Sequence, residues 1–209
     1  DLTSVTGNVQ SLKNAVNELA AAGSTRTDFG LNQAQRVLDG DRQHGLGGAR
    51  EEAKQVVVVF TDGEPSTFSN WSGGVAANAV NLAKDLKDDK VTVYTIGMFE
   101  DADPSDTDGR FNKYMNGVSS NYPHAEVTNW RGARTQDWDD CKLGTRVTEG
   151  NYYFAADDAE ELENAFSTIA DNVSTSKVAA GANTVLSDTL SEFFTFPEGL
   201  TGSSDGGMV

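Results

Sequence analysis

Apolar and polar residues follow two different periods along the chain. Five stretches place apolar residues three and four positions apart, which predicts amphipathic helices. They are residues 8–22, 29–38, 72–87, 111–118 and 157–173. Three shorter apolar runs predict strands. They are residues 55–61, 90–99 and 151–156. Strands that alternate with helices in this order predict a parallel sheet covered by helices on both sides, which is an α/β fold.

The strand predicted at 55–61 ends in an acid and a glycine, in the stretch "VVVVFTDG". Its unbroken apolar run predicts burial on both faces, as in a parallel sheet. In open α/β sheets, ligands bind beyond the carboxyl ends of the strands, which is where Asp62 lies. Asp62 is therefore a candidate site residue, and a plain Asp-Gly turn is the alternative interpretation.

A loop rich in hydroxyl groups precedes the second predicted helix and contains Ser24, Thr25 and Thr27. These residues are good helix N-caps, which is the structural interpretation. If the loop meets Asp62 at one edge of the sheet, the oxygen atoms suit a hard cation such as Mg²⁺, Mn²⁺ or Ca²⁺. A site with so few carboxylates leaves the cation under-neutralised, so it would attract an acidic group from a partner.

These segments together resemble the von Willebrand factor A domain. The resemblance rests on "GSTRTDFGLNQA", "VVVVFTDGEPS", "VTVYTIGMF" and "YYFAADDAEELENAFSTIADNV", and it covers roughly residues 8–174. It implies a Rossmann-like fold and a metal-ion-dependent adhesion site built from three elements. Thr25, with Thr27 as the alternative, would be the second element and Asp62 the third, holding Mg²⁺ or else Mn²⁺ or Ca²⁺. Glu64 and Ser66 would belong to the ligand-binding loops.

The first element of that site, Asp-x-Ser-x-Ser, has no counterpart near the start of the chain. Asp1 is followed by Thr3 and Val5 where the pattern needs serines. We therefore expect residues 1–174 to be a partial domain that lacks the first strands of the family and the first metal-site loop. A separate segment or chain that supplies these strands and this loop would then be a binding partner. Metal binding by these residues alone is expected to be weak or absent.

The composition changes after residue 174, and we expect residues 175–209 to be strands of a β-rich, immunoglobulin-like sandwich. The stretch "KYMNGVSSNYPHA", residues 113–125, is similar to von Willebrand A domains of Gram-positive surface and pilus proteins. That similarity implies a location at the cell wall or pilus and a candidate isopeptide-related role for Asp188, whose alternative is an ordinary turn aspartate. One function that it implies is an adhesin that binds an acidic side chain of a host or matrix protein. The alternative is a structural shaft component with a vestigial metal site. Other pilus subunits are possible partners.

Charge and composition limit the classes of partner that the protein is expected to bind. The net charge is −16, from 32 acidic and 16 basic residues, which disfavours nucleic acid and anionic membranes. No apolar run approaches the length of a membrane span, so membrane insertion is not expected. Cys141 is the only cysteine, which excludes a disulfide within the chain, and we expect a semi-buried thiol of low reactivity.

The sequence also bears on a calcium site and on enzymatic activity. The acidic stretch 101–109 matches the spacing of a calcium loop only in part. With Gly109 as the sixth position of such a loop, the twelfth is Met115, where glutamate is needed. We therefore interpret it as a solvated acidic loop, with a calcium site as the alternative. The chain contains neither Gly-x-Ser-x-Gly nor a P-loop lysine motif, and we predict a binding module rather than an enzyme.

Overall fold

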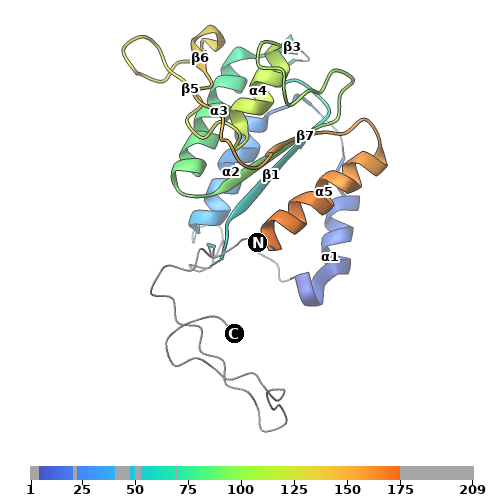
Figure 1. The fold of residues 1–209 in the computed structure, drawn as a ribbon. Helices are drawn as coiled ribbons and strands as arrows, with labels where there is room; N and C mark the ends of the chain where they lie inside the picture. Colours follow the sequence, from blue (N-terminus) through green and yellow to red (C-terminus); the bar gives the residue numbers. More distant parts are fainter. Residues whose placement is uncertain (1–4, 21–22, 41–47, 50–52, 69, 175–209) are drawn as a thin grey trace, which may run out of the picture. The chain divides into compact units, whose positions relative to one another are not determined.

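The structure is a computed structural model that describes residues 5–20, 23–40, 48–49, 53–68 and 70–174. Three parallel strands form the main sheet in the order β1-β4-β7 (Figure 1). The strands are β1 (Val56–Thr61), β4 (Thr92–Gly97) and β7 (Tyr153–Ala155). The helices are α1 (Val5–Asn17), α2 (Thr27–Asp39), α3 (Gly73–Asp88), α4 (Arg110–Val118) and α5 (Ala159–Ser174). The predicted α/β class and element order are confirmed, whereas the β-rich unit predicted for 175–209 lies outside the described residues.

Side chains alternate across the sheet, so each face has its own core. On one face, Val57, Val59 and Val93 pack with residues of α2, α3 and α4, among them the fully buried Tyr114. On the other face, residues of β4 and β7 pack against α5. The buried members of this second cluster are Tyr94, Ile96, Ala156, Ala165 and Ile169. The sheet is thus a middle layer between one group of three helices and the single helix α5.

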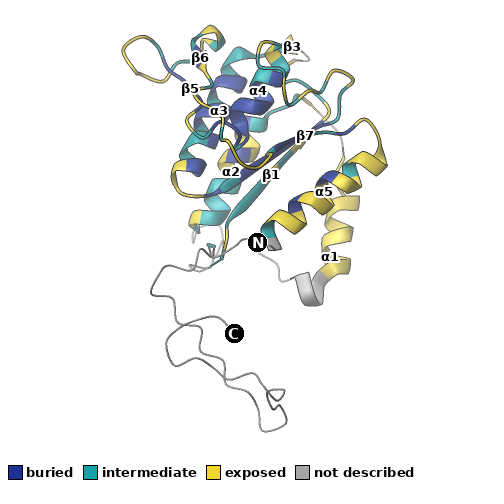
Figure 2. Ribbon diagram, in the orientation of Figure 1, coloured by how far each residue is buried: buried dark blue, intermediate teal, exposed yellow. Residues whose placement is uncertain are grey.

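The prediction that β1 is buried on both faces is wrong. Within the described part of the chain, β1 pairs with β4 alone and forms an edge of the sheet. Val58 is 37% exposed and Phe60 is 50% exposed, on the face opposite to Val57 and Val59 (Figure 2). The apolar run identified the strand correctly, but α5 packs on β4 and β7 and leaves these two side chains of β1 open.

Short elements fill the stretches that connect the larger ones. An antiparallel pair, β2 (Ser66–Thr67) and β3 (Asn70–Trp71), follows β1. The stretch 119–150 connects α4 to the region of β7. It contains a second antiparallel pair, β5 (Glu126–Val127) and β6 (Cys141–Lys142), with the 3-10 helix η2 (Trp138–Asp140) before β6. Asn81 of α3 bonds both backbone groups of Val127, at 2.9 and 3.2 Å, and so attaches this stretch to the core.

Helix α1 lies earlier in the chain than expected, and its apolar side chains are open to solvent. Val9 is 49% exposed and Val16 is 65% exposed. None of the helices in the described part of the chain combines the length and hydrophobicity that crossing a bilayer requires.

A buried lysine terminates α4. Lys87 of α3 is 8% exposed, and its Nζ donates to the backbone carbonyls of Gly117, Ser119 and Tyr122 at 2.8, 3.2 and 3.0 Å. The last carbonyls of a helix have no donor within that helix, and Lys87 supplies one to Gly117. Its other two bonds go to carbonyls just beyond the end of α4. Burial, with a smaller contribution from nearby Lys84, lowers the pKa of Lys87 to about 7.

Candidate functional site

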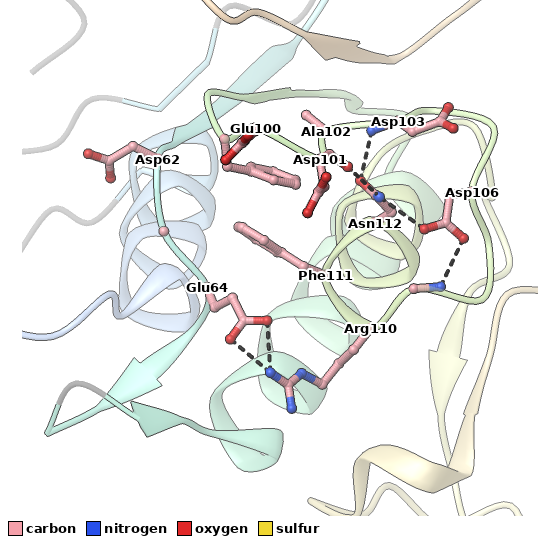
Figure 3. A pocket seen from close by; sticks show the side chains of 13 residues that line it. Asp62, Glu64, Glu100, Asp101, Ala102, Asp103, Asp106, Arg110, Phe111 and Asn112 are labelled. Atoms are coloured by element: carbon pink, nitrogen blue, oxygen red, sulfur yellow. Dashed lines mark hydrogen bonds and ion pairs between the residues drawn. The ribbon is translucent and has the colours of Figure 1, made fainter.

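The carboxyl ends of β1 and β4 form a rim that carries most of the predicted site residues. Asp62 follows β1 directly and is exposed. The hydroxyl of Thr61 donates to the carbonyl of Gly63 at 2.8 Å, and this bond fixes the turn at the end of the strand. Figure 3 shows the Asp62 carboxylate turned away from Arg110 and Phe111 on the opposite side of the neighbouring pocket. The acid is thus held on a short turn with its carboxylate free to bind.

The hydroxyl-rich loop lies against the same rim. The backbone N–H of Thr25 donates to the hydroxyl of Ser66 at 2.9 Å, and the N–H of Ser66 donates back to the carbonyl of Thr25 at 3.0 Å. A Cβ atom placed on Gly63 would lie 3.3 Å from the hydroxyl oxygen of Thr25. The structure therefore brings Thr25 beside the residue that follows Asp62, although 37 positions separate the two in the sequence (62 − 25).

Thr27, the alternative to Thr25, has a different environment. Its hydroxyl forms a 2.5 Å hydrogen bond with the hydroxyl of Tyr114, which is fully buried. Burial raises the pKa of Tyr114, so this phenol stays protonated and keeps its hydrogen bond. The Thr27 hydroxyl is therefore committed to the core, whereas the Thr25 hydroxyl lies at the rim. The role of either residue in metal binding stays a prediction.

The two residues predicted for the ligand-binding loops both have partners within the chain. Arg110 donates to both carboxylate oxygens of Glu64 at 2.9 Å, and its guanidinium lies 4.5 Å from the ring centre of Trp71. Ser66 accepts from Thr25, as described above. Glu64 is partly exposed and still reachable, but these contacts hold the loop after Asp62 in one conformation.

A pocket of about 1030 Å³ lies beside Asp62 (Figure 3). Its walls carry six carboxylates and one arginine, together with the stacked rings of Phe99 and Phe111, whose centres are 4.0 Å apart. The acidic residues are Asp62, Glu64, Glu100, Asp101, Asp103 and Asp106. The sequence indicated a solvated acidic loop here, but part of that loop is fixed to α4.

The side chain of Asn112 in α4 makes the hydrogen bonds that attach the acidic loop to this helix. Its side-chain NH₂ donates to the carbonyl of Asp101 at 2.8 Å and to the carboxylate of Asp106 at 3.0 Å. Its side-chain oxygen accepts from the N–H of Asp103 at 3.0 Å and from the hydroxyl of Tyr153 at 2.6 Å. The carboxylate of Asp106 also accepts from backbone N–H groups at the start of α4, above all that of Gly109, and these bonds lower its pKa. The carboxylate of Asp106 therefore stabilises the loop itself.

The oxygen donors at the rim fit a hard cation in type but not in number. Mg²⁺ takes six oxygen ligands, and the rim offers the Thr25 hydroxyl and the Asp62 carboxylate. Among the described residues, no group of three or more His, Cys, Asp or Glu side chains is arranged to hold a metal ion. Water, a ligand carboxylate and side chains outside the described residues would have to supply the other positions.

Two further predicted residues lie away from the rim. Cys141 is buried at the start of β6, and burial raises its pKa to about 11, so the thiol is protonated at neutral pH. This agrees with the low reactivity expected for it. Asp188 lies outside the described residues, and its isopeptide-related role stays a prediction.

Three residues at the site were not predicted from the sequence. Tyr114 and Asn112 lie on α4, where their spacing reads as an ordinary helix, and Arg110 begins that helix. A usable signal was present: Arg110, Asn112 and Tyr114 lie together beyond the acidic loop, within a helix of only nine residues. The pairing of Arg110 with Glu64 spans 46 positions and needs the folded chain to appear.

The parallel sheet between helices, with Thr25 and Asp62 at its carboxyl rim, defines an α/β domain. The family model of the von Willebrand factor type A domain matches residues 1–138, about two thirds of the chain. The chain therefore belongs to this family, whose domains mediate protein–protein interaction and adhesion. The match includes both Thr25 and Asp62. Comparison with curated proteins and with solved structures finds no match.

Proposed function

We propose that this domain captures a protein ligand through a divalent cation held at the rim by the Thr25 hydroxyl and the Asp62 carboxylate. The observation that supports the proposal is the close approach of the Thr25 loop to Gly63. A Cβ atom placed on Gly63 would lie 3.3 Å from the hydroxyl oxygen of Thr25. Mg²⁺ is the proposed ion, with Mn²⁺ or Ca²⁺ as substitutes, because all three favour oxygen ligands.

Charge explains why such a site would select an acidic ligand. One carboxylate cannot neutralise a divalent cation, so the ion keeps a net positive charge that attracts an acidic side chain. The net charge of the chain, −16, repels acidic proteins at long range, and the ion provides a local exception. Binding without catalysis is the proposed role, since the resemblance assigns these residues to adhesion.

The sequence offers no Asp-x-Ser-x-Ser within residues 1–209. We propose that this first element comes from a segment outside these residues and joins the site beside β1, which forms an edge of the sheet among the described residues. We also infer, from the similarity of residues 113–125, an extracellular setting on a Gram-positive cell wall or pilus. The bond-forming role of Asp188 belongs to the same proposal.

A structural role in a surface or pilus shaft, with a vestigial metal site, is the second candidate. The small number of oxygen donors among the described residues favours it. In this case the rim would hold no ion, and the contacts between Glu64 and Arg110 would simply stabilise the loop.

Thermal unfolding with and without Mg²⁺ distinguishes the two candidates. We expect Mg²⁺ at about 100 times its Kd to add about 2.7 kcal/mol to the free energy of unfolding of the full-length gene product, and EDTA to remove this gain. Asp62→Ala and Thr25→Val should each abolish most of it. Asp101→Ala, at a carboxylate on the far side of the same pocket, is the matched control and should keep it.

Two results would count against the adhesion proposal. If Mg²⁺ stabilises Asp62→Ala as much as the unmodified protein, the ion binds elsewhere. If Mg²⁺ stabilises neither the unmodified protein nor Asp62→Ala, the shaft role is favoured.

A further inference from the structure

A second cavity of about 610 Å³ lies between α2, α3 and the segment that follows residue 133. It shares no lining residue with the acidic pocket beside Asp62. Residues from three separate parts of the chain line it, and its volume falls within the range of small-molecule sites. Neither the family match nor the adhesion proposal assigns it a ligand.

The charged residues of this cavity are already neutralised within the chain. Asp28 is 4% exposed and accepts two hydrogen bonds from Arg26, at 2.9 and 2.8 Å. Arg134 pairs with Asp85 of α3. A charged ligand would therefore compete with existing ion pairs, and an anionic one would also meet the negative charge of the whole molecule.

Three neutral amides also line the cavity, and those of Asn32 and Gln136 belong to solvent-exposed residues. In the part of the chain that the structure describes, the side chains of Asn32, Asn78 and Gln136 have no hydrogen-bond partner. Asn81, which also lines the cavity, spends both ends of its amide on the backbone of Val127. Each free amide offers donors and an acceptor together, so the cavity presents paired donors and acceptors without net charge.

An apolar patch lies among these amides. Phe29 is 59% exposed and lines the cavity, and the guanidinium of Arg26 lies 3.7 Å from its ring centre, which restricts the ring. Leu82 of α3 adds a second apolar surface. The ring of Phe29 is thus exposed to a ligand, with one of its faces covered by the guanidinium of Arg26.

We propose that this cavity binds a neutral saccharide. Sugar hydroxyls both donate and accept hydrogen bonds, which matches Asn32, Asn78 and Gln136. The aliphatic face of a sugar ring fits an exposed aromatic ring such as Phe29, and the absence of net charge fits the neutralised Asp28 and Arg134. A neutral peptide segment has similar polar groups, and it is the competing ligand that the experiment must separate.

Saturation-transfer NMR on the full-length protein tests the proposal. The probes are four neutral disaccharides that differ in linkage and stereochemistry: maltose, cellobiose, lactose and α-mannobiose. We expect saturation transfer to at least one of them at millimolar concentration. Asn78→Ala and Asn32→Ala should each weaken binding of that sugar about tenfold, since each removes one polar partner. EDTA should leave binding unchanged, because no metal is involved.

The matched control is Asn164→Ala, at an exposed helical asparagine on α5 outside the cavity, which should bind the sugar unchanged. Alanine favours helices, so all three variants should fold, and far-UV circular dichroism checks this. The proposal is overturned if none of the four sugars binds, if both cavity variants bind as well as the unmodified protein, or if only a neutral tripeptide competes for the cavity. These outcomes do not depend on the metal, so they leave the adhesion proposal to its own test.

Discussion

Lys87→Met is expected to lower the free energy of unfolding by about 3 kcal/mol. The substitution keeps a long apolar side chain but removes three hydrogen bonds to the carbonyls of Gly117, Ser119 and Tyr122. The carbonyl of Tyr122 keeps the N–H of Ala125, whereas those of Gly117 and Ser119 lose their donor. Each buried carbonyl left without a donor costs about 1–3 kcal/mol, and relief from burying a charge offsets part of the sum. Urea unfolding followed by circular dichroism measures the change.

Lys84→Met is the matched control. Lys84 lies on the same helix and pairs with Asp88 at the surface, so its loss should cost less than about 1 kcal/mol. An equal cost for the two variants would show that Lys87 does not act as a cap for α4.

The cost of Lys87→Met should also depend on pH. The pKa of Lys87 is lowered to about 7 from its ordinary value of 10.5. Between these values the unfolded state binds a proton that the folded state does not, so the contribution of Lys87 to the free energy of unfolding rises with pH from about 7 and is constant below it. The variant should therefore lose more stability at pH 9 than at pH 6. A difference that does not change with pH would mean that the three carbonyls keep the ammonium charged throughout this range.

Asn112→Ala is expected to cost about 3 kcal/mol and to loosen the acidic loop. The side chain makes four hydrogen bonds, and its removal leaves the hydroxyl of Tyr153 buried without the acceptor that it now has. The amide N–H of Asp103, which donates to Asn112, should exchange with solvent faster. Urea unfolding and hydrogen exchange of residues 101–109 measure the two effects.

Asn78→Ala provides the comparison, because Asn78 is also a helical asparagine but has no side-chain hydrogen bond among the described residues. Its cost should stay within about 0.5 kcal/mol. If exchange in the loop is unchanged in Asn112→Ala, other contacts hold the loop, and Asn116, which donates to the carbonyls of Pro104 and Asp106, is the first to test.

The sequence was sufficient to predict the fold class and the approach of Thr25 to the end of β1. Both rest on rules that act at short range: periodicity identifies the elements, and parallel strands end at one rim. The choice between Thr25 and Thr27 was left open, because the bond from Thr27 to Tyr114 joins residues 87 positions apart. No local pattern reports such a contact.

Buried polar side chains were the other class that sequence reasoning did not find. Lys87 near the end of α3 reads as a solvent-facing lysine, and Asn112 reads as a neutral helical position. Their burial is decided by carbonyls and hydroxyls that come from other parts of the chain. The exposure of Val58 and Phe60 was missed for the opposite reason, since apolarity predicts a strand but not the number of its neighbours.

The open side of β1 couples two properties that are usually separate. Among the described residues β1 pairs on one side only. An unpaired valine-rich edge is a template for cross-β assembly, so a polypeptide that leaves it bare risks fibre formation. Any parallel strand that shields this edge must end at the same rim as Asp62, and its last residues would then stand beside the proposed cation site. Under the proposed function, shielding against aggregation and competence to bind would thus arise in one step.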